Sequence, residues 1–151
     1  MNSYKFFSPL EIKEFKDKGF VIVRNLFTIE EMRAVKNHTL NLLNKKPMAG
    51  KEMVYLEESL KAPGEKQVSR IENFLPFNNQ LNKLFNDGRL MIYLKELFGE
   101  TAVLFKDKIN YKQPGEGIAA PHQDMQSNWS DFADFFISVQ VCIDENTIEN
   151  G

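Results

Sequence analysis

The chain has 151 residues, of which 42% are hydrophobic and 26% charged, a composition typical of a folded globular protein. The formal net charge is −2 and the lysines form no tract, so we expect no nucleic-acid partner. No apolar run approaches the length that crosses a bilayer and no apolar signal core is visible at the N-terminus, so we expect a cytoplasmic protein without a membrane partner.

Two capping boxes predict the first helices. Ser8 with Glu11 opens a helix that should end at Gly19, and a second box at residues 28–31 opens a longer helix to about residue 45. Between them, the apolar run at residues 20–23 predicts a short buried strand.

The middle of the chain alternates between irregular and helical patterns. Residues 47–66 lose any period and contain two Pro/Gly pairs, so we expect a surface excursion or lid there. Residues 68–74 predict an extended segment. Residues 78–86 and 90–98 then predict two short helices.

The last third of the chain has the composition of strands. Residues 101–111 and 135–143 are rich in β-branched and aromatic residues. We therefore expect an α+β fold in a single domain, residues 1–151, with a helical part at about 1–99 and strands at about 101–151.

The first of these strands has one polar and one apolar face. The residues that share the polar face are Lys106, Lys108, Asn110 and Lys112. If the face with Phe105 and Ile109 packs on the helices, the polar face looks either into solvent or into a wet, polar site. The pattern alone slightly favours solvent.

Two residues with ligand chemistry have ordinary interpretations. His38 borders the apolar face of the second helix, where we expect a packed, hydrogen-bonded side chain and not a metal ligand. Cys142 is the only cysteine, which excludes an intrachain disulfide and a thiolate zinc cluster, and its apolar surroundings favour a small buried residue.

The strongest candidate for chemistry is His122 with Asp124, which follow a Pro-Gly turn at residues 113–117. Residues i and i+2 of a strand project from the same face, so the imidazole and the carboxylate would meet at one point. They would supply two ligands of the 2-His-1-carboxylate triad that holds non-haem Fe(II). By itself, His-x-Asp also occurs by chance.

In its context, this pattern resembles the phytanoyl-CoA dioxygenase family of Fe(II)/2-oxoglutarate oxygenases. The segments that carry the resemblance, in order and spacing, are residues 19–27, residues 104–112, the Pro-Gly turn, His122-Gln123-Asp124 and the closing Glu149-Asn150-Gly151. Together they cover nearly the whole chain.

The resemblance implies a double-stranded β-helix, a jelly-roll barrel with helices packed on one side, incomplete here at the C-terminus. Fe(II) would be held by His122, Asp124 and a later histidine. Such enzymes use 2-oxoglutarate as cosubstrate and O2 to hydroxylate a small organic substrate, releasing succinate and CO2; the protein supplies geometry and a dry pocket.

By the same resemblance, Arg70, Lys108 and Asn110 are expected to contact 2-oxoglutarate or the substrate, which reverses the preference for a solvated strand face. Gln140 occupies a cosubstrate position where some members have an aromatic residue. Trp129 is interpreted either as a wall of the pocket or as a core anchor.

No histidine follows Asp124, whereas the family continues past its Glu-Asn-Gly to a distal histidine and to a basic residue for 2-oxoglutarate. We therefore expect an N-terminal fragment of a dioxygenase, inactive by itself. The alternatives are a half-domain completed by another chain and a binding protein that has lost catalysis. Because unpaired strand edges attract other chains, we expect self-association or poor solubility.

Two other functions remain open. The chain could be a non-catalytic binding or assembly module in which His122 and Asp124 simply bond to each other. It could also be a metal-dependent hydrolase or isomerase on a cupin-like barrel, with the ion as Lewis acid, although further His or Glu ligands nearby are missing. The substrate is not readable, since one fold hosts many substrates.

Overall fold

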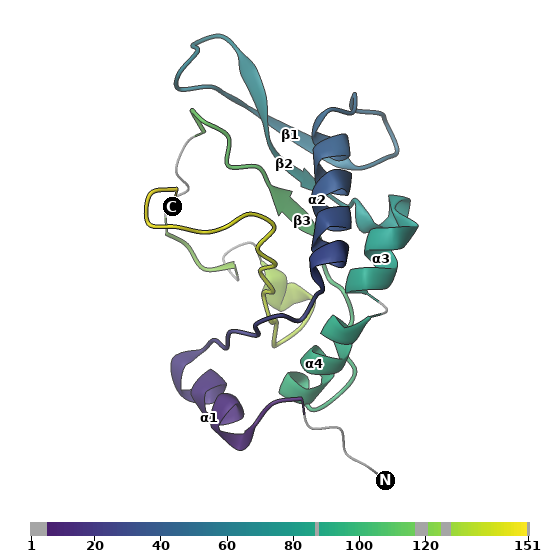
Figure 1. Ribbon diagram of the computed structural model, residues 1–151, viewed down its shortest axis with the longest axis vertical. Coiled ribbons are helices and arrows are strands. Elements are labelled where there is room, and N and C mark those ends of the chain that lie inside the picture. Colours follow the sequence, from purple (N-terminus) through teal and green to yellow (C-terminus); the bar gives the residue numbers. More distant parts are fainter. Residues whose placement is uncertain (1–5, 87, 117–120, 125–127, 151) are drawn as a thin grey trace.

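The computed structural model describes residues 6–86, 88–116, 121–124 and 128–150. Its α-helices are α1 (Pro9–Lys18), α2 (Ile29–Leu43), α3 (Asn79–Phe85) and α4 (Arg89–Phe98); its strands are β1 (Met53–Glu58), β2 (Lys66–Glu72) and β3 (Lys108–Asn110); its 3-10 turns include η1 (Leu75–Phe77) and η3 (Trp129–Asp131). Figure 1 shows the β1–β2 hairpin at one end of the molecule and α1 at the other.

The helices begin where local hydrogen bonds satisfy their first N–H groups. The Ser8 side chain accepts the backbone N–H of Glu11 at the start of α1, and Thr28 accepts that of Glu31 at the start of α2. α1 ends at Gly19, whose φ of +80° favours glycine. These capping boxes and the two later helices are confirmed as predicted.

The sheet is antiparallel, with β2 in the centre and the order β1-β2-β3. Ile71 of β2 pairs with Ile109 of β3, and a bulge interrupts the β1–β2 pairing between Tyr55 and Leu56. Since the pleat sends alternate side chains to opposite faces, β2 presents Ile71 to one face and its neighbours Arg70 and Glu72 to the other.

The core lies between the apolar face of this sheet and the helices. It consists of Val35 from α2, Leu81 from α3, Ile71, Ile109, Phe74 and Leu75. Figure 1 shows α2 lying along the sheet, with α3 and α4 continuing to one side of it. Removal of these apolar side chains from water supplies the main stabilisation of the fold.

Two polar contacts fix the segment around β3. The two carboxylate oxygens of Asp107 accept the backbone N–H groups of Phe74 and Leu75, at 2.9 and 3.1 Å. The hydroxyl of Tyr111 donates to the carbonyl of Thr39 in α2 at 2.7 Å, and burial raises the pKa of this phenol to about 12. β3 is therefore tied to the start of η1 and to α2.

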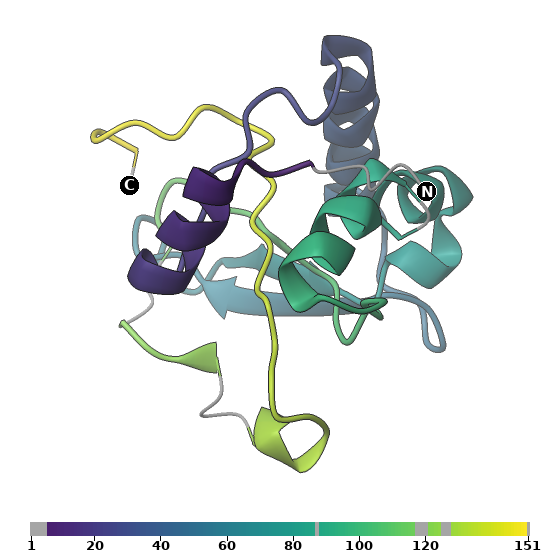
Figure 2. The same cartoon turned by 90° about the horizontal axis from the view of Figure 1, so that it is seen from below.

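After η3 the chain passes between α1 and α4 in the view of Figure 2, and it contacts α4 and then α2. The ring of Phe135 packs edge-on against Phe98 with centroids 5.3 Å apart, and Ile143 packs on the core. Lys36 of α2 then pairs with Asp144 at 2.6 Å. These contacts hold the segment without strand pairing.

Three predicted strands are wrong in whole or in part within the described residues. Residues 20–23 and 135–143 are irregular, and residues 101–111 form a strand only at Lys108–Asn110. Their apolar composition suits a strand, but a strand also needs a neighbour that pairs with its backbone groups. Among the described residues, only β3 has such a neighbour in this part of the chain.

The predicted surface excursion at residues 47–66 is also wrong in part, because β1 lies inside it and pairs with β2. The turn signal at Pro63 and Gly64 was correct, since Gly64 has a φ of +88° between the two strands. The bulge and the single inward-facing valine explain why β1 shows no clear period.

Cys142, predicted to be buried, is exposed, and the side-chain N–H of Asn146 donates to its sulfur at 2.9 Å. The prediction failed because it assumed that residues 135–143 form a packed strand.

The α+β class is confirmed as a mixture of helices and a small antiparallel sheet, and the sheet does not close upon itself in the described residues. None of the helices in this part of the chain is long and apolar enough to cross a membrane.

Replacing Asp107 by alanine should destabilise the fold, because two N–H groups lose their shared acceptor. We expect a loss of about 1–3 kcal/mol in the free energy of unfolding, measured by urea denaturation. Asp17→Ala, which removes an exposed carboxylate on α1, is the control and should cost little. Equal losses in the two variants would contradict this role of Asp107.

Candidate functional site

The turn that precedes His122 is fixed on the β1–β2 hairpin. The backbone N–H of Leu60 donates to the carbonyl of Gly115 at 2.8 Å. A Cβ at Gly115 would lie 2.7 Å from the hydroxyl oxygen of Ser59, and its φ is +92°. Glycine is therefore required here both for space and for conformation.

The side chains of His122 and Asp124 lie close together, although residues 121–124 do not form the strand that the prediction assumed. Nε2 of His122 lies 3.8 Å from Oδ1 of Asp124, while the other oxygen, Oδ2, accepts a hydrogen bond of 2.5 Å from the Ser138 hydroxyl. Metal–ligand bonds of about 2.0–2.2 Å put neighbouring donors on one ion roughly 3 Å apart and opposite donors roughly 4 Å apart. At 3.8 Å, the nitrogen and oxygen would need a small side-chain rotation to meet on one ion as neighbours, and the Ser138 hydroxyl orients the carboxylate.

Within the described residues, no group of three or more His, Cys, Asp or Glu side chains is placed to hold a metal. His38, the other histidine, is engaged elsewhere: its Nε2 contacts the amide oxygen of Gln80 at 2.5 Å, and its Nδ1 lies 3.3 Å from the amide nitrogen of Asn78. The prediction of a packed, hydrogen-bonded His38 is confirmed.

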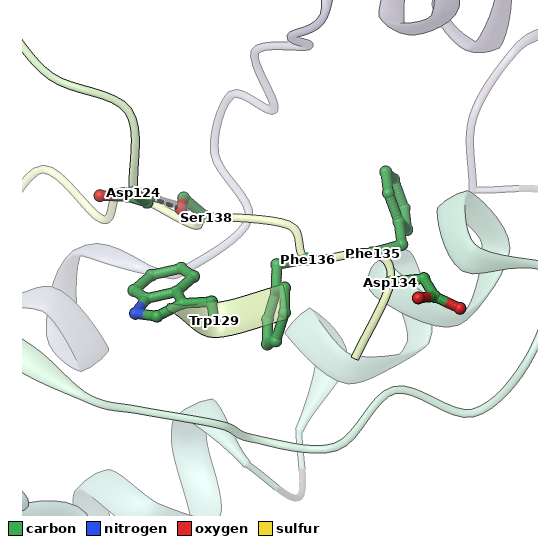
Figure 3. A pocket seen from close by; sticks show the side chains of 6 residues that line it. All are labelled: Asp124, Trp129, Asp134, Phe135, Phe136 and Ser138. Carbon is green, nitrogen blue, oxygen red and sulfur yellow. Dashed lines mark hydrogen bonds between the residues drawn. The ribbon is translucent and has the colours of Figure 1, made fainter. Parts of the chain in front are cut away.

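Asp124 lies at the edge of a hollow of about 280 Å³ with a largely aromatic wall (Figure 3). Its lining residues are Asp124, Trp129, Asp134, Phe135, Phe136 and Ser138. The ring of Phe105 packs against this wall, and its centroid lies 5.4 Å from that of Trp129 and 4.9 Å from that of Phe136. Trp129 is therefore both a wall of the hollow and part of an aromatic cluster.

A second group of polar side chains lies on the face of the sheet opposite the core. Arg70 pairs in register with Asn110, and Glu72 pairs with Lys108, so all four share one face. Nε of Arg70 and Nζ of Lys106 each lie 3.1 Å from Oε1 of Glu72. We call the three residues Arg70, Glu72 and Lys106 the sheet-face cluster.

The structure thus brings together Arg70, Lys108 and Asn110 on the sheet, whereas Gln140 lies outside the sheet, exposed in the irregular segment after Ser138. Sequence reasoning missed Glu72 and Ser138. The spacing of Glu72, two residues after Arg70 on a predicted extended segment, was a signal for the first. No local signal could have linked Ser138 to Asp124, fourteen residues away.

The ionised form of one carboxyl group on the turn, that of Glu116, is unfavourable in the folded protein. Burial raises the pKa of Glu116, and the nearby charge of Glu57 raises it further. Among the described residues, its Oε2 is buried without a hydrogen-bond partner. A raised pKa means that the folded state binds the proton more tightly than the unfolded state does, so Glu116 lowers stability as pH rises through its titration range.

Glu116→Gln should therefore raise the melting temperature at pH 7, and the gain should shrink as pH falls through the raised pKa of Glu116 and be lost below about 4.5, the usual carboxyl value. Thermal scans across this pH range would measure it, with Glu65→Gln on the same hairpin as an exposed control. A gain that is the same at every pH would show that charge is not the cause.

Ser138→Ala should weaken metal binding by about tenfold, since loss of an outer-shell hydrogen bond typically costs a metal site that much. Mn²⁺ titration followed by electron paramagnetic resonance would measure the affinity. Ser130→Ala, an exposed serine on η3, is the matched control. Unchanged affinity in Ser138→Ala would remove this serine from the site.

Comparison with known proteins places these observations in context. The family model of phytanoyl-CoA dioxygenase (PhyH) matches residues 15–151. The 2-aminoethylphosphonate dioxygenase of uncultured bacterium HF130_AEPn_1 is 32% identical over 146 residues, which is 97% of this chain and 55% of that protein. No solved structure gives a significant match.

Two further relatives are more distant or match a shorter region. The methylphosphonate hydroxylase of Gimesia maris is 36% identical over 89 residues, 59% of this chain and 34% of that protein. The probable alpha-ketoglutarate-dependent hypophosphite dioxygenase of Stutzerimonas stutzeri is 24% identical over 143 residues, 92% of this chain and 49% of that protein. The chain spans about half the length of the two curated relatives that it matches nearly end to end.

Proposed function

Because this chain belongs to the phytanoyl-CoA dioxygenase family, we propose that it carries the first half of the active site of an Fe(II)/2-oxoglutarate-dependent dioxygenase. The observation that carries the proposal is the arrangement of His122 and Asp124, whose Nε2 and Oδ1 converge while Ser138 holds the second carboxylate oxygen. One relative is named as alpha-ketoglutarate-dependent, which supports the cosubstrate.

His122 and Asp124 would hold the iron, and an imidazole from outside the described residues would complete the triad. Bound Fe(II) supplies the oxidative chemistry that couples decarboxylation of 2-oxoglutarate to hydroxylation by O2. The residues of this chain orient and enclose: the hydroxyl of Ser138 fixes the carboxylate, and the ring of Trp129 helps to exclude water from the hollow.

For the cosubstrate, we propose Arg70, Lys108 and Asn110 on the sheet face, with Gln140 as a further contact. Two cations and an amide on neighbouring strands suit the carboxylates of 2-oxoglutarate, which accept charge-assisted hydrogen bonds. Gln140 lies two residues after Ser138, close in sequence to the proposed metal site.

For the substrate, we propose a small phosphorus oxyanion, of which an alkylphosphonate is the main class. Two relatives are named for phosphonates and one for hypophosphite. The hollow beside Asp124, at about 280 Å³, is large enough for a molecule of this size.

We further propose that the three-stranded sheet is the first part of a double-stranded β-helix and that residues 1–151 belong to one domain. The support is the match of the family model from residue 15 onward. The alternative function is a catalytically inactive binding or assembly module of the same fold, which the 3.8 Å between His122 and Asp124 would also fit as a structural pair.

The first test of the proposal is metal binding. We expect Mn²⁺ to bind the chain, and His122→Ala to abolish that binding, because removal of one of two ligands leaves a single carboxylate. The His38→Gln variant is the control, since His38 is bonded to α3 and should not matter. Equal Mn²⁺ affinity in His122→Ala and the unsubstituted chain would refute the iron site.

The second test separates an oxygenase half-site from a mere structural pair. Under anaerobic conditions, Fe(II) and 2-oxoglutarate should give at most a weak visible charge-transfer band with the chain alone. Added imidazole, as a substitute for the third ligand, should strengthen the band. A band that imidazole leaves unchanged would favour the binding-module alternative. With O2 and 2-aminoethylphosphonate, ³¹P magnetic resonance and succinate release would then report turnover.

A further inference from the structure

Glu72 is an unusual residue for the face of a sheet that is expected to bind anions. Its side chain is only 5% exposed, and it lies between the half-exposed side chains of Arg70 and Lys106. A buried carboxylate loses its hydration, and an apolar residue of similar volume often serves stability as well as a buried ion pair does. Its presence therefore calls for a role beyond stability.

The geometry of the sheet-face cluster suggests that role. Nε of Arg70 and Nζ of Lys106 contact the same oxygen, Oε1 of Glu72, each at 3.1 Å. The two positive groups therefore cannot lie further apart than twice that distance. Glu72 holds two cations from separate parts of the chain close together, although they would otherwise repel each other.

Arg70 is oriented from a second side as well. Its guanidinium carbon lies 4.1 Å from the ring centroid of Tyr55, its register partner on β1. Nε is only one of the five N–H donors of a guanidinium, so Arg70 keeps more donors than Glu72 uses. The ring and the carboxylate together restrict the rotation of the fork and leave donors for a ligand.

We propose that Glu72 is a positioning residue for 2-oxoglutarate: it fixes Arg70 and Lys106 so that a carboxylate of the cosubstrate meets an already oriented guanidinium. This inference rests on the proposed function. Preorganised donors bind a ligand without the entropic cost of ordering a long side chain at the moment of binding. Lys106 thereby joins the cosubstrate site beside Arg70.

The direction in which one substitution changes the affinity for 2-oxoglutarate tests this inference. Glu72→Gln removes a negative charge from an anion-binding face, so simple electrostatics predicts tighter binding of 2-oxoglutarate. Positioning predicts the opposite, a loss of about tenfold in affinity, which corresponds to about 1.4 kcal/mol. Calorimetric titration of the 151-residue chain with 2-oxoglutarate, in the presence of Mn²⁺, would measure the change.

A double-mutant cycle separates positioning from general damage to the fold. If Glu72 acts through Arg70, Glu72→Gln should cause little further loss of affinity in an Arg70→Met background. If it acts through the fold, the two losses should add. The matched control is Glu52→Gln, because the Glu52 side chain is also 5% exposed and is paired with a lysine, Lys45, that does not belong to the sheet-face cluster.

The outcomes are distinguishable. Weaker binding in Glu72→Gln, absent in Glu52→Gln and not additive with Arg70→Met, supports the inference. Unchanged or tighter binding in Glu72→Gln, or additive losses, overturns it while the proposed function stands. An unsubstituted chain that does not bind 2-oxoglutarate at all overturns the inference together with the cosubstrate assignment of the proposed function.

Discussion

The central position of β2 is the constraint on which the rest of the structure depends. Because it is paired on both edges, its register fixes β1 and β3, and its pleat fixes which residues face the core. Ile71 on one face anchors the helices through the core, while Arg70 and Glu72 on the other face form the polar site. A shift of one residue in this register would bury the charges and expose the core, so the register that builds the core also places Arg70 and Glu72 on the opposite face.

Local patterns predicted the helices well, since a capping box or a left-handed glycine acts within four residues of its own position. The strands were harder, because pairing depends on residues far away in sequence: β1 is nearly hidden in an irregular pattern, yet it pairs along its whole length with β2. The reverse error occurred at residues 135–143, where a strand-like composition has no neighbour to pair with among the described residues. The composition of a segment indicates which secondary structure it can form, and its neighbours in the folded chain determine whether it forms that structure.

The same difference between local patterns and contacts distant in sequence applies to the candidate site. The shared face of Lys108 and Asn110 follows from their two-residue spacing on β3 and was open to prediction. His122 and Asp124 are also close together, but not for the predicted reason, because residues 121–124 form no strand. The residues that orient these groups were not open to prediction. Ser138 contacts Asp124 from fourteen residues further along the sequence. Lys106 contacts Glu72 although α3 and α4 lie between them in the sequence. Orientation by outer residues is a property of the folded chain, so sequence spacing finds ligands more readily than it finds their supports.

The links from Asp107 to the start of η1 also bear on the order in which the chain folds. The β1–β2 hairpin closes over a short loop, whereas Asp107 contacts backbone N–H groups that lie 32 and 33 residues earlier, with α3 and α4 in between. Closing the longer loop costs more chain entropy, and β3 pairs over only three residues. The hairpin can thus form early and serve as a template, with β3 docking last.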